Sequence, residues 1–120
     1  MGYILVIDDD KGEREKTRLV LSVKGYKAKF SGSWEEARTL FDGDLDWDLV
    51  IVRVAMEEVN GNDIARYIRQ SKKPRTPILA IAVAEDDIDQ KVFSDVLMTP
   101  CKLEALGEKI APIVPPPPPR

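Results

Sequence analysis

The side chains in this chain that could do chemistry are acids that follow one apolar run and an arginine that ends another. Asp8, Asp9 and Asp10 come directly after the apolar residues 3–7, and Arg53 closes the apolar run that begins at Leu49. Carboxylates can hold a divalent cation, whereas a guanidinium stays protonated and only donates hydrogen bonds. We therefore expect Arg53 to form a charge-assisted ion pair with Asp8 or Asp9, in the place that a metal would take.

Two alternatives to this ion pair stay open. Asp8 and Asp9 could form a working metal site, or Arg53 could point into solvent without a partner if its strand ends one residue early. Asp8, Asp9 and Arg53 carry a formal charge of about -1 together, and a cation close to Arg53 would be repelled. We expect Mg²⁺ binding to be weak or absent, and no other cofactor.

The composition excludes several classes of function. The 120 residues contain no histidine and one cysteine, so neither an imidazole base nor an internal disulfide is available. No nucleophile–base pair or glycine-rich phosphate loop is present, and we expect no enzymatic activity. A net charge of -3 argues against nucleic-acid binding. The chain has no apolar stretch of the roughly 20 residues that cross a bilayer, and we expect a cytoplasmic location.

Strand-like and helix-like patterns alternate along the chain, which predicts an α/β fold with a doubly wound parallel sheet and five strand–helix pairs, (βα)5. Helix caps support the first two helices, because Asp10 precedes Glu13 and Ser33 precedes Glu36 at capping-box spacing. The segment 86–93 has many acids and few apolar anchors, so its helix could be short or mobile. The expected strands are residues 3–7, 26–30, 48–53, 78–82 and 96–98, and the expected helices are residues 11–24, 34–42, 60–72, 86–93 and 102–111.

Ligand sites of such folds lie at the carboxyl ends of the strands. The residues that should meet there are Asp8, Asp9, Arg53, Ala82 and Thr99. Over residues 1–111 the chain resembles the receiver domains of response regulators, of the chemotaxis-regulator type. The matching stretches are Ile4-Leu5-Val6-Ile7-Asp8-Asp9-Asp10, Gly25-Tyr26, Asp48-Leu49-Val50-Ile51-Val52, Asn60-Gly61, Pro77-Ile78-Leu79-Ala80 and Met98-Thr99-Pro100.

The resemblance implies a flavodoxin-like, five-stranded sheet in the order 2-1-3-4-5 and a phosphorylation site at the strand ends. In the family, two acids hold Mg²⁺, an aspartate ending the third strand is phosphorylated, and a Ser or Thr and a Lys contact the phosphoryl group. An aromatic residue near the start of the fifth strand acts as a switch. This chain retains Asp8 and Asp9, and its Thr99-Pro100 bond is a candidate for a cis peptide. It departs from the family pattern at Arg53, Ala82, Thr99 and Val96.

These departures lead to the hypothesis of a degenerate pseudo-receiver, a phosphorylation-independent protein-interaction module in two-component-type signal transduction. The resemblance places its partner surface on residues 86–111, which homodimerisation or the core could occupy instead. Alternatives are a switch that responds to a small anion or nucleotide, or a conventional phosphorelay receiver with a non-standard acceptor. The apolar strip proposed for the partner comprises Ile88, Val92, Phe93, Val96, Met98 and Leu103.

The last nine residues, 112–120, form a separate proline-rich tail or the start of a linker. The prolines from Pro115 to Pro119 favour polyproline II or disorder. An SH3-like partner is an alternative reading of this run.

Overall fold

A computed structural model describes residues 2–118, and its centre is a parallel sheet of five strands. The strands lie in the order β2-β1-β3-β4-β5, which confirms the sheet order expected from the sequence. The strands are β1 (Tyr3–Ile7), β2 (Ala28–Ser31), β3 (Trp47–Arg53), β4 (Ile78–Ala82) and β5 (Asp95–Met98). Within residues 2–118 the helices are α1 (Lys11–Lys24), α2 (Trp34–Asp42), α3 (Gly61–Arg69) and α4 (Leu103–Ile110).

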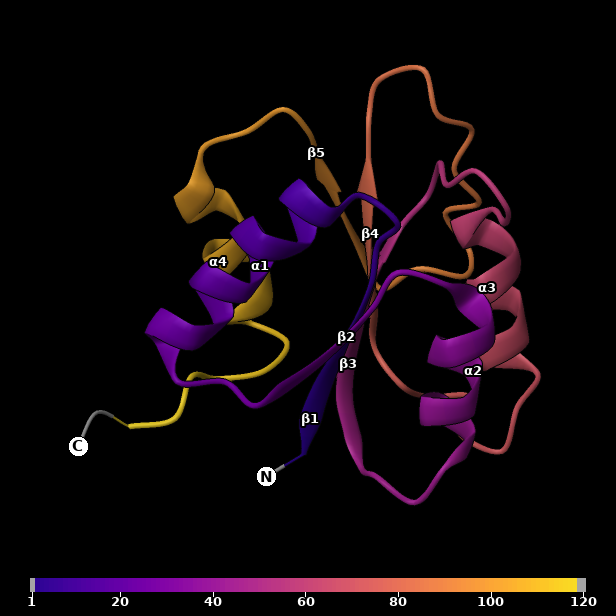
Figure 1. The fold of residues 1–120 in the computed structure, drawn as a ribbon, viewed down its shortest axis with the longest axis horizontal. Coiled ribbons are helices and arrows are strands. Elements are labelled where there is room, and N and C mark those ends of the chain that lie inside the picture. The colour runs from indigo at the N-terminus through magenta and orange to yellow at the C-terminus, as the bar shows by residue number, and fades with distance from the viewer. Residues whose placement is uncertain (1, 119–120) are drawn as a thin grey trace.

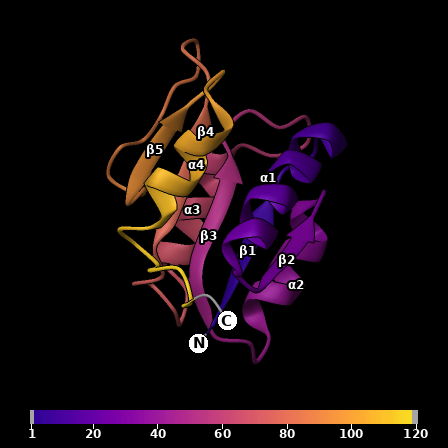
Figure 2. The same cartoon turned by 90° about the vertical axis from the view of Figure 1, so that its left-hand side faces the viewer.

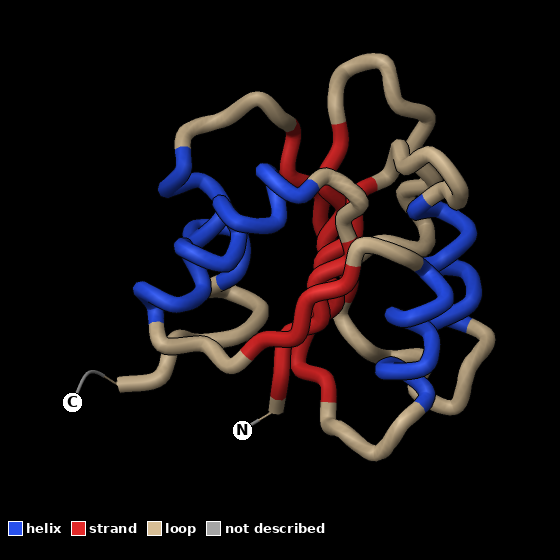
Figure 3. Tube along the Cα trace, in the orientation of Figure 1, coloured by secondary structure: helices blue, strands red, loops and turns tan. Residues whose placement is uncertain are grey.

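The helices cover both faces of the sheet, α1 and α4 on one and α2 and α3 on the other (Figure 1). The side view in Figure 2 shows α1 and α4 side by side across their face, and the tube in Figure 3 shows the strands as the middle layer. Successive side chains of a strand point to opposite faces. In β3, Val50 and Val52 therefore join the core under α2 and α3, while Leu49 and Ile51 join the core under α1 and α4.

The ends of α1 follow from local chemistry that the sequence predicts. The Asp10 side chain accepts a hydrogen bond of 2.9 Å from the Glu13 backbone N–H, which satisfies one free donor of the first turn. At the other end Gly25 adopts φ 83°, a left-handed conformation that favours glycine, and its N–H bonds the last carbonyls of the helix. The Ser33 hydroxyl caps α2 in the same way, accepting from Glu36 N at 3.3 Å.

The helix expected at residues 86–93 is absent, so the (βα)5 helix count was wrong in this structure. The connection between β4 and β5 consists of turns and irregular chain. Its acidic side chains accept hydrogen bonds from nearby backbone N–H groups that a helix would otherwise pair. Asp86 accepts from Val83 N at 2.9 Å, and Asp89 accepts from Lys91 N at 3.2 Å. Such bonds compete with helix formation in a segment that has few apolar anchors.

Side chains of α3 hold this connection in place. The buried Asn62 donates from Nδ2 to the Asp87 carbonyl at 2.7 Å and accepts from the Asp89 N–H at 3.1 Å. Arg66 pairs with Asp89 at 3.1 Å, and Arg69 donates to the Val92 carbonyl at 3.0 Å. Backbone groups that a helix would have paired are satisfied by α3 instead.

We expect Asn62→Ala to lower the free energy of unfolding by about 1 to 3 kcal/mol, because it leaves a backbone donor and acceptor without partners. Urea denaturation measures the loss, and hydrogen exchange should show faster exchange of the Asp89 amide. Gln70→Ala, at the exposed C-cap of the same helix, is the matched control. Unchanged protection of the Asp89 amide in Asn62→Ala would contradict this role.

The packed chain continues beyond residue 111. Ile113 and Val114 pack against the core under α1 and α4, and the Tyr26 hydroxyl donates to the Val114 carbonyl. Pro117 is half-buried, and a Cβ placed on Gly25 would lie 3.1 Å from its ring. The first part of the proline run therefore lies against the end of α1, while Pro119 and Arg120 lie outside the described residues.

None of the helices found in residues 2–118 has the length and apolar character needed to span a bilayer.

Candidate functional site

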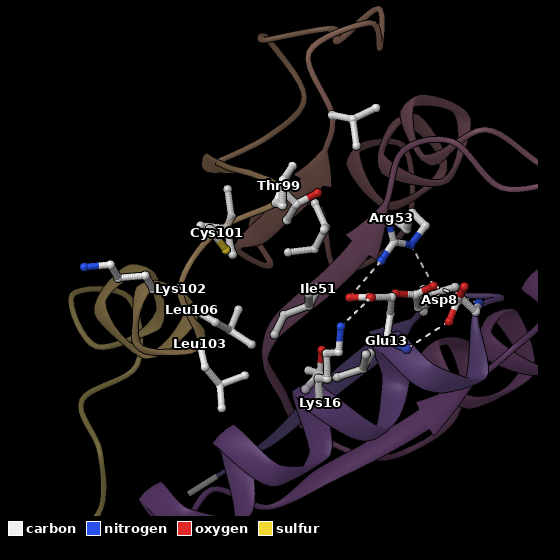
Figure 4. A pocket seen from close by; sticks show the side chains of 18 residues that line it. Asp8, Glu13, Lys16, Ile51, Arg53, Thr99, Cys101, Lys102, Leu103 and Leu106 are labelled. Carbon is white, nitrogen blue, oxygen red and sulfur yellow. Dashed lines mark hydrogen bonds and ion pairs between the residues drawn. The ribbon is translucent and has the colours of Figure 1, made fainter.

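A cavity of about 410 Å³ opens where β1, β3, β4 and β5 end, next to the first turns of α1 and α4. Figure 4 shows Asp8, Glu13 and Arg53 on one side of it and Thr99, Cys101 and Lys102 on the other. Its deeper wall is apolar, with Ile51 and Leu106 among the lining residues. The topology of the sheet thus brings charged strand-end side chains together over part of the α1–α4 core.

The ion pair expected from the sequence is present between Arg53 and Asp8. Arg53 Nε lies 2.8 Å from Asp8 Oδ1, and the two side chains are only 16% and 6% exposed. The bond joins one guanidinium nitrogen to one carboxylate oxygen, and the same Asp8 oxygen also accepts from the Asp10 N–H at 2.9 Å. Arg53 Nη2 extends toward Glu13 Oε2 at 3.8 Å. Two nearby carboxylates therefore balance the arginine.

The electrostatics of this pair keep Arg53 charged. The hydrogen bond to Asp8 raises the pKa of Arg53 above its ordinary value, burial opposes this, and the charges of Asp8, Glu13 and Asp10 add to the increase. Removing either side chain alone would leave the other as a buried charge without a partner.

Asp9 does not share the pocket with Asp8, contrary to the expectation that the two acids converge. Its Oδ2 accepts from the Glu57 N–H at 2.9 Å, so it ties the start of α1 to the loop after β3. It lines a separate groove with Trp34 and Met56. No local sequence pattern predicts this bond, since it depends on how the loop folds back.

That loop folds back because α3 begins very close to β3. The Gly61 N–H donates to the Val54 carbonyl at 2.8 Å, and a Cβ on Gly61 would come within 2.6 Å of the Arg53 carbonyl oxygen. Only glycine tolerates this approach. The Asn60-Gly61 pair thus sets the position of the loop whose N–H binds Asp9.

The other departures from the family pattern lie in different surroundings. Ala82 is buried in the core under α2 and α3 and is not among the cavity-lining residues. Thr99 lines the cavity, but its hydroxyl donates back to the Ala82 carbonyl at 3.1 Å, and the Thr99-Pro100 bond is cis. Val96 is half-buried against the same core as Ala82. Thr99 therefore acts in the turn that ends β5.

The apolar strip proposed for a partner is not one continuous surface. Phe93 is only 8% exposed and belongs to the core, which corrects its assignment to the surface. Ile88, Val92 and Val96 are half-buried and pack against that core. Without a helix at residues 86–93, these side chains fill the space beside α3. Met98 and Leu103, each 46% exposed, remain accessible.

Two charged residues of the site were missed from the sequence. Glu13 and Lys16 line the cavity and pair with each other at 3.0 Å. Both lie in the first turns of α1, whose start is fixed by the Asp10 cap at the edge where the strands end. The cap signal could have indicated them, because residues three and four apart share a helix face.

The fold and the strand-end acids define a receiver-like signalling domain, and comparison with known proteins identifies its family. Residues 4–110 match the response regulator receiver domain family, and the chain belongs to it. It is 34% identical over 109 residues to the response regulator MprA of Mycolicibacterium vanbaalenii, covering 86% of this chain and 46% of that protein. It is also 27% identical over 112 residues to the sensor histidine kinase AtsR of Burkholderia thailandensis, covering 88% of this chain and 18% of that protein.

Solved structures agree with this assignment. The response regulator protein TrrA of Thermotoga maritima, described in complex with Mg²⁺ and BeF, has a TM-score of 0.81 at 28% identity, with 95% of this chain and 100% of that chain covered. The chemotaxis protein CheY4 of Vibrio cholerae has the same fold, with a TM-score of 0.82 at 24% identity over 95% of this chain and 99% of that chain. The chain spans less than half the length of the curated relatives above.

Proposed function

We propose that this chain is a pseudo-receiver, a phosphorylation-independent protein-interaction module of a two-component signalling pathway. The observation that carries the proposal is the buried ion pair between Arg53 and Asp8. Arg53 stands where the family has its phosphate-accepting aspartate. A protonated guanidinium has no lone pair for attack on a phosphoryl donor, and its raised pKa keeps it protonated.

The donor set does not fit the Mg²⁺ that the family uses. Mg²⁺ requires near-octahedral oxygen ligation, but Asp8 Oδ1 already accepts from Arg53 and from the Asp10 N–H. Asp9 is bonded to the loop after β3. A guanidinium beside Asp8 would also repel a divalent ion by several kcal/mol at an effective dielectric of about 20. We expect Mg²⁺ affinity to be weak or absent.

The small-anion or nucleotide switch is less well supported. Arg53, Lys16 and Lys102 could attract an anion. Asp8, Asp10 and Glu13 line the same cavity, so its formal charges balance and give an anion little net attraction. A conventional receiver with another acceptor would have to use one of these acids. Asp8 pairs with Arg53, Asp10 caps α1 and Glu13 pairs with Lys16, so each of these acids already has a partner.

Exposure to acetyl phosphate with Mg²⁺ should leave the intact mass of the protein unchanged, and beryllofluoride with Mg²⁺ should leave its tryptophan fluorescence unchanged. TrrA, which is described in complex with Mg²⁺ and BeF, is the positive control. Stoichiometric phosphorylation of the chain would contradict the pseudo-receiver proposal. Peptide mapping would then show whether Glu13 or another acid is the acceptor.

The partner surface that we propose is centred on the exposed Met98 and Leu103, at the two ends of the loop from β5 to α4. Its partner is a protein of the signalling pathway. An SH3-like partner for Pro115 to Pro119 is a second candidate; Pro115 and Pro116 are exposed, whereas Pro117 lies near Gly25. Pull-down with Met98→Gln and Leu103→Gln tests the first surface, and removal of residues 115–120 tests the second.

A further inference from the structure

An apolar groove lies between α1 and α4. These two helices cover the face of the sheet opposite α2 and α3 (Figure 2). Its volume is about 620 Å³, and its walls come from Leu19 and Val23 on α1 and Leu103 on α4. These three side chains are 54%, 75% and 46% exposed. Apolar side chains gathered in this way on one face indicate a contact surface.

The two walls of the groove carry opposite charges. Lys24 lines the α1 wall, and Glu104 and Glu108 line the α4 wall. All three residues are exposed, and in the described part of the chain none of them takes part in an ion pair. The charges flank the apolar centre of the groove, as polar rims flank protein interfaces.

The opposite charges also lie at the same level along the groove. A Cβ placed on Gly107 would be 3.5 Å from Lys24 Cε and 4.0 Å from Val20 Cγ1, so the Lys24 side chain passes beside Gly107. Glu108 is the next residue along α4, and Glu104 lies about one turn earlier. The Lys24 level of α1 therefore matches the Glu108 level of α4.

We propose that the groove is closed by the same groove of a second copy of this chain, about a two-fold axis that runs along the groove. Such an axis keeps each residue at its own level and places α1 of one copy over α4 of its partner. Lys24 of each copy then faces the acidic wall of the other, and the apolar walls close over each other. A two-fold axis across the groove would instead bring equal charges together.

Charge complementarity selects a second copy as the occupant. Two-fold dimers are the commonest soluble assemblies, and they need a surface that complements itself. This groove meets that requirement, because its basic and acidic walls face each other after the two-fold rotation. The inference does not depend on the absence of phosphorylation, since neither Arg53 nor Asp8 lines the groove. Leu103 belongs both to the groove and to the partner surface proposed above, so the second copy and that partner compete for this side chain.

Sedimentation equilibrium over micromolar to millimolar concentrations should show a monomer–dimer equilibrium. Replacing Leu19 and Val23 together by Gln should remove the dimer while thermal unfolding of the monomer changes little, because both side chains are exposed. Ser22→Gln is the matched control, since Ser22 is an exposed residue of the same helix that does not line the groove. A protein that stays monomeric, or that forms open-ended assemblies, would overturn the proposal.

A charge reversal tests the direction of the axis. Lys24→Glu and Glu108→Lys should each weaken self-association by roughly tenfold, because symmetry repeats every lost attraction. Mixing the two variants, one of them isotope-labelled, should restore a heterodimer that native mass spectrometry identifies, because the side chain introduced by Lys24→Glu then faces the one introduced by Glu108→Lys. Circular dichroism checks that both variants fold. If the mixture associates no better than either variant alone, the proposed geometry is wrong. If a helix of another protein binds in the groove and the chain does not bind itself, the second copy is excluded as the occupant of the groove.

Discussion

Replacing Arg53 by methionine should lower the free energy of unfolding by about 3 to 5 kcal/mol, because it strands a buried carboxylate without its partner. Asp8 has a side chain only 6% exposed, and within residues 2–118 the bond from the Asp10 N–H is the one that this side chain retains after the change. Methionine preserves much of the arginine's apolar stem, so the loss reports the charge. Urea denaturation at neutral pH measures it.

The control for this prediction removes both charges. In the Asp8→Asn background, Arg53→Met should cost much less, because no buried carboxylate is left unpaired. Lys16→Met breaks an exposed pair with Glu13, whose side chains are 65% and 41% exposed, and should change the stability by less than about 1 kcal/mol. Additive losses for Arg53→Met and Asp8→Asn would show that the two residues act separately.

The second large effect is a gain of metal binding on restoring the family residues. Arg53→Asp combined with Ala82→Thr and Thr99→Lys should raise Mg²⁺ affinity by roughly a thousandfold or more, because a third carboxylate then replaces the guanidinium beside Asp8. The same variant should then respond to beryllofluoride. Calorimetric titration with Mg²⁺ and the fluorescence of the two tryptophans measure the two responses.

Ala82→Thr with Thr99→Lys, keeping Arg53, is the control and should not bind Mg²⁺. If the folded triple variant also fails to bind, the bond from the Glu57 N–H would be the reason, because Asp9 must leave it to reach the metal. A further exchange at position 57 would test that explanation: Glu57→Pro removes the N–H that holds Asp9.

The sheet could be predicted from the sequence because its signals are local. Short apolar runs, the Asp10 and Ser33 caps and the glycine at position 25 mark each strand and helix near where it lies in the structure. The ion pair of Arg53 and Asp8 followed from the topology, since both positions end neighbouring strands. An uncompensated charge there is costly enough to select a partner.

The errors occurred where distant groups decide the structure. Residues 86–93 were predicted to form a short helix despite few apolar anchors, but Asn62 and Arg69 on α3 bind the backbone of this segment, a contact that no local pattern reveals. Phe93 is drawn into the core by the same arrangement. Asp9 lies apart from Asp8 because the loop between β3 and α3 offers it the Glu57 N–H. These outcomes depend on tertiary contacts between segments far apart in sequence.

The cation beside Asp8 is the guanidinium of Arg53, which is part of the chain, and this determines how long the positive charge stays in the pocket. An acyl phosphate forms and hydrolyses, so a domain that carries one reports how recently it was modified. A guanidinium that belongs to the chain is present from synthesis to degradation, and salt or chelators cannot wash it out of a pocket where it is 16% exposed. On the proposed function, the output of such a domain does not depend on the time since a modification. It follows the number of copies of the protein in the cell.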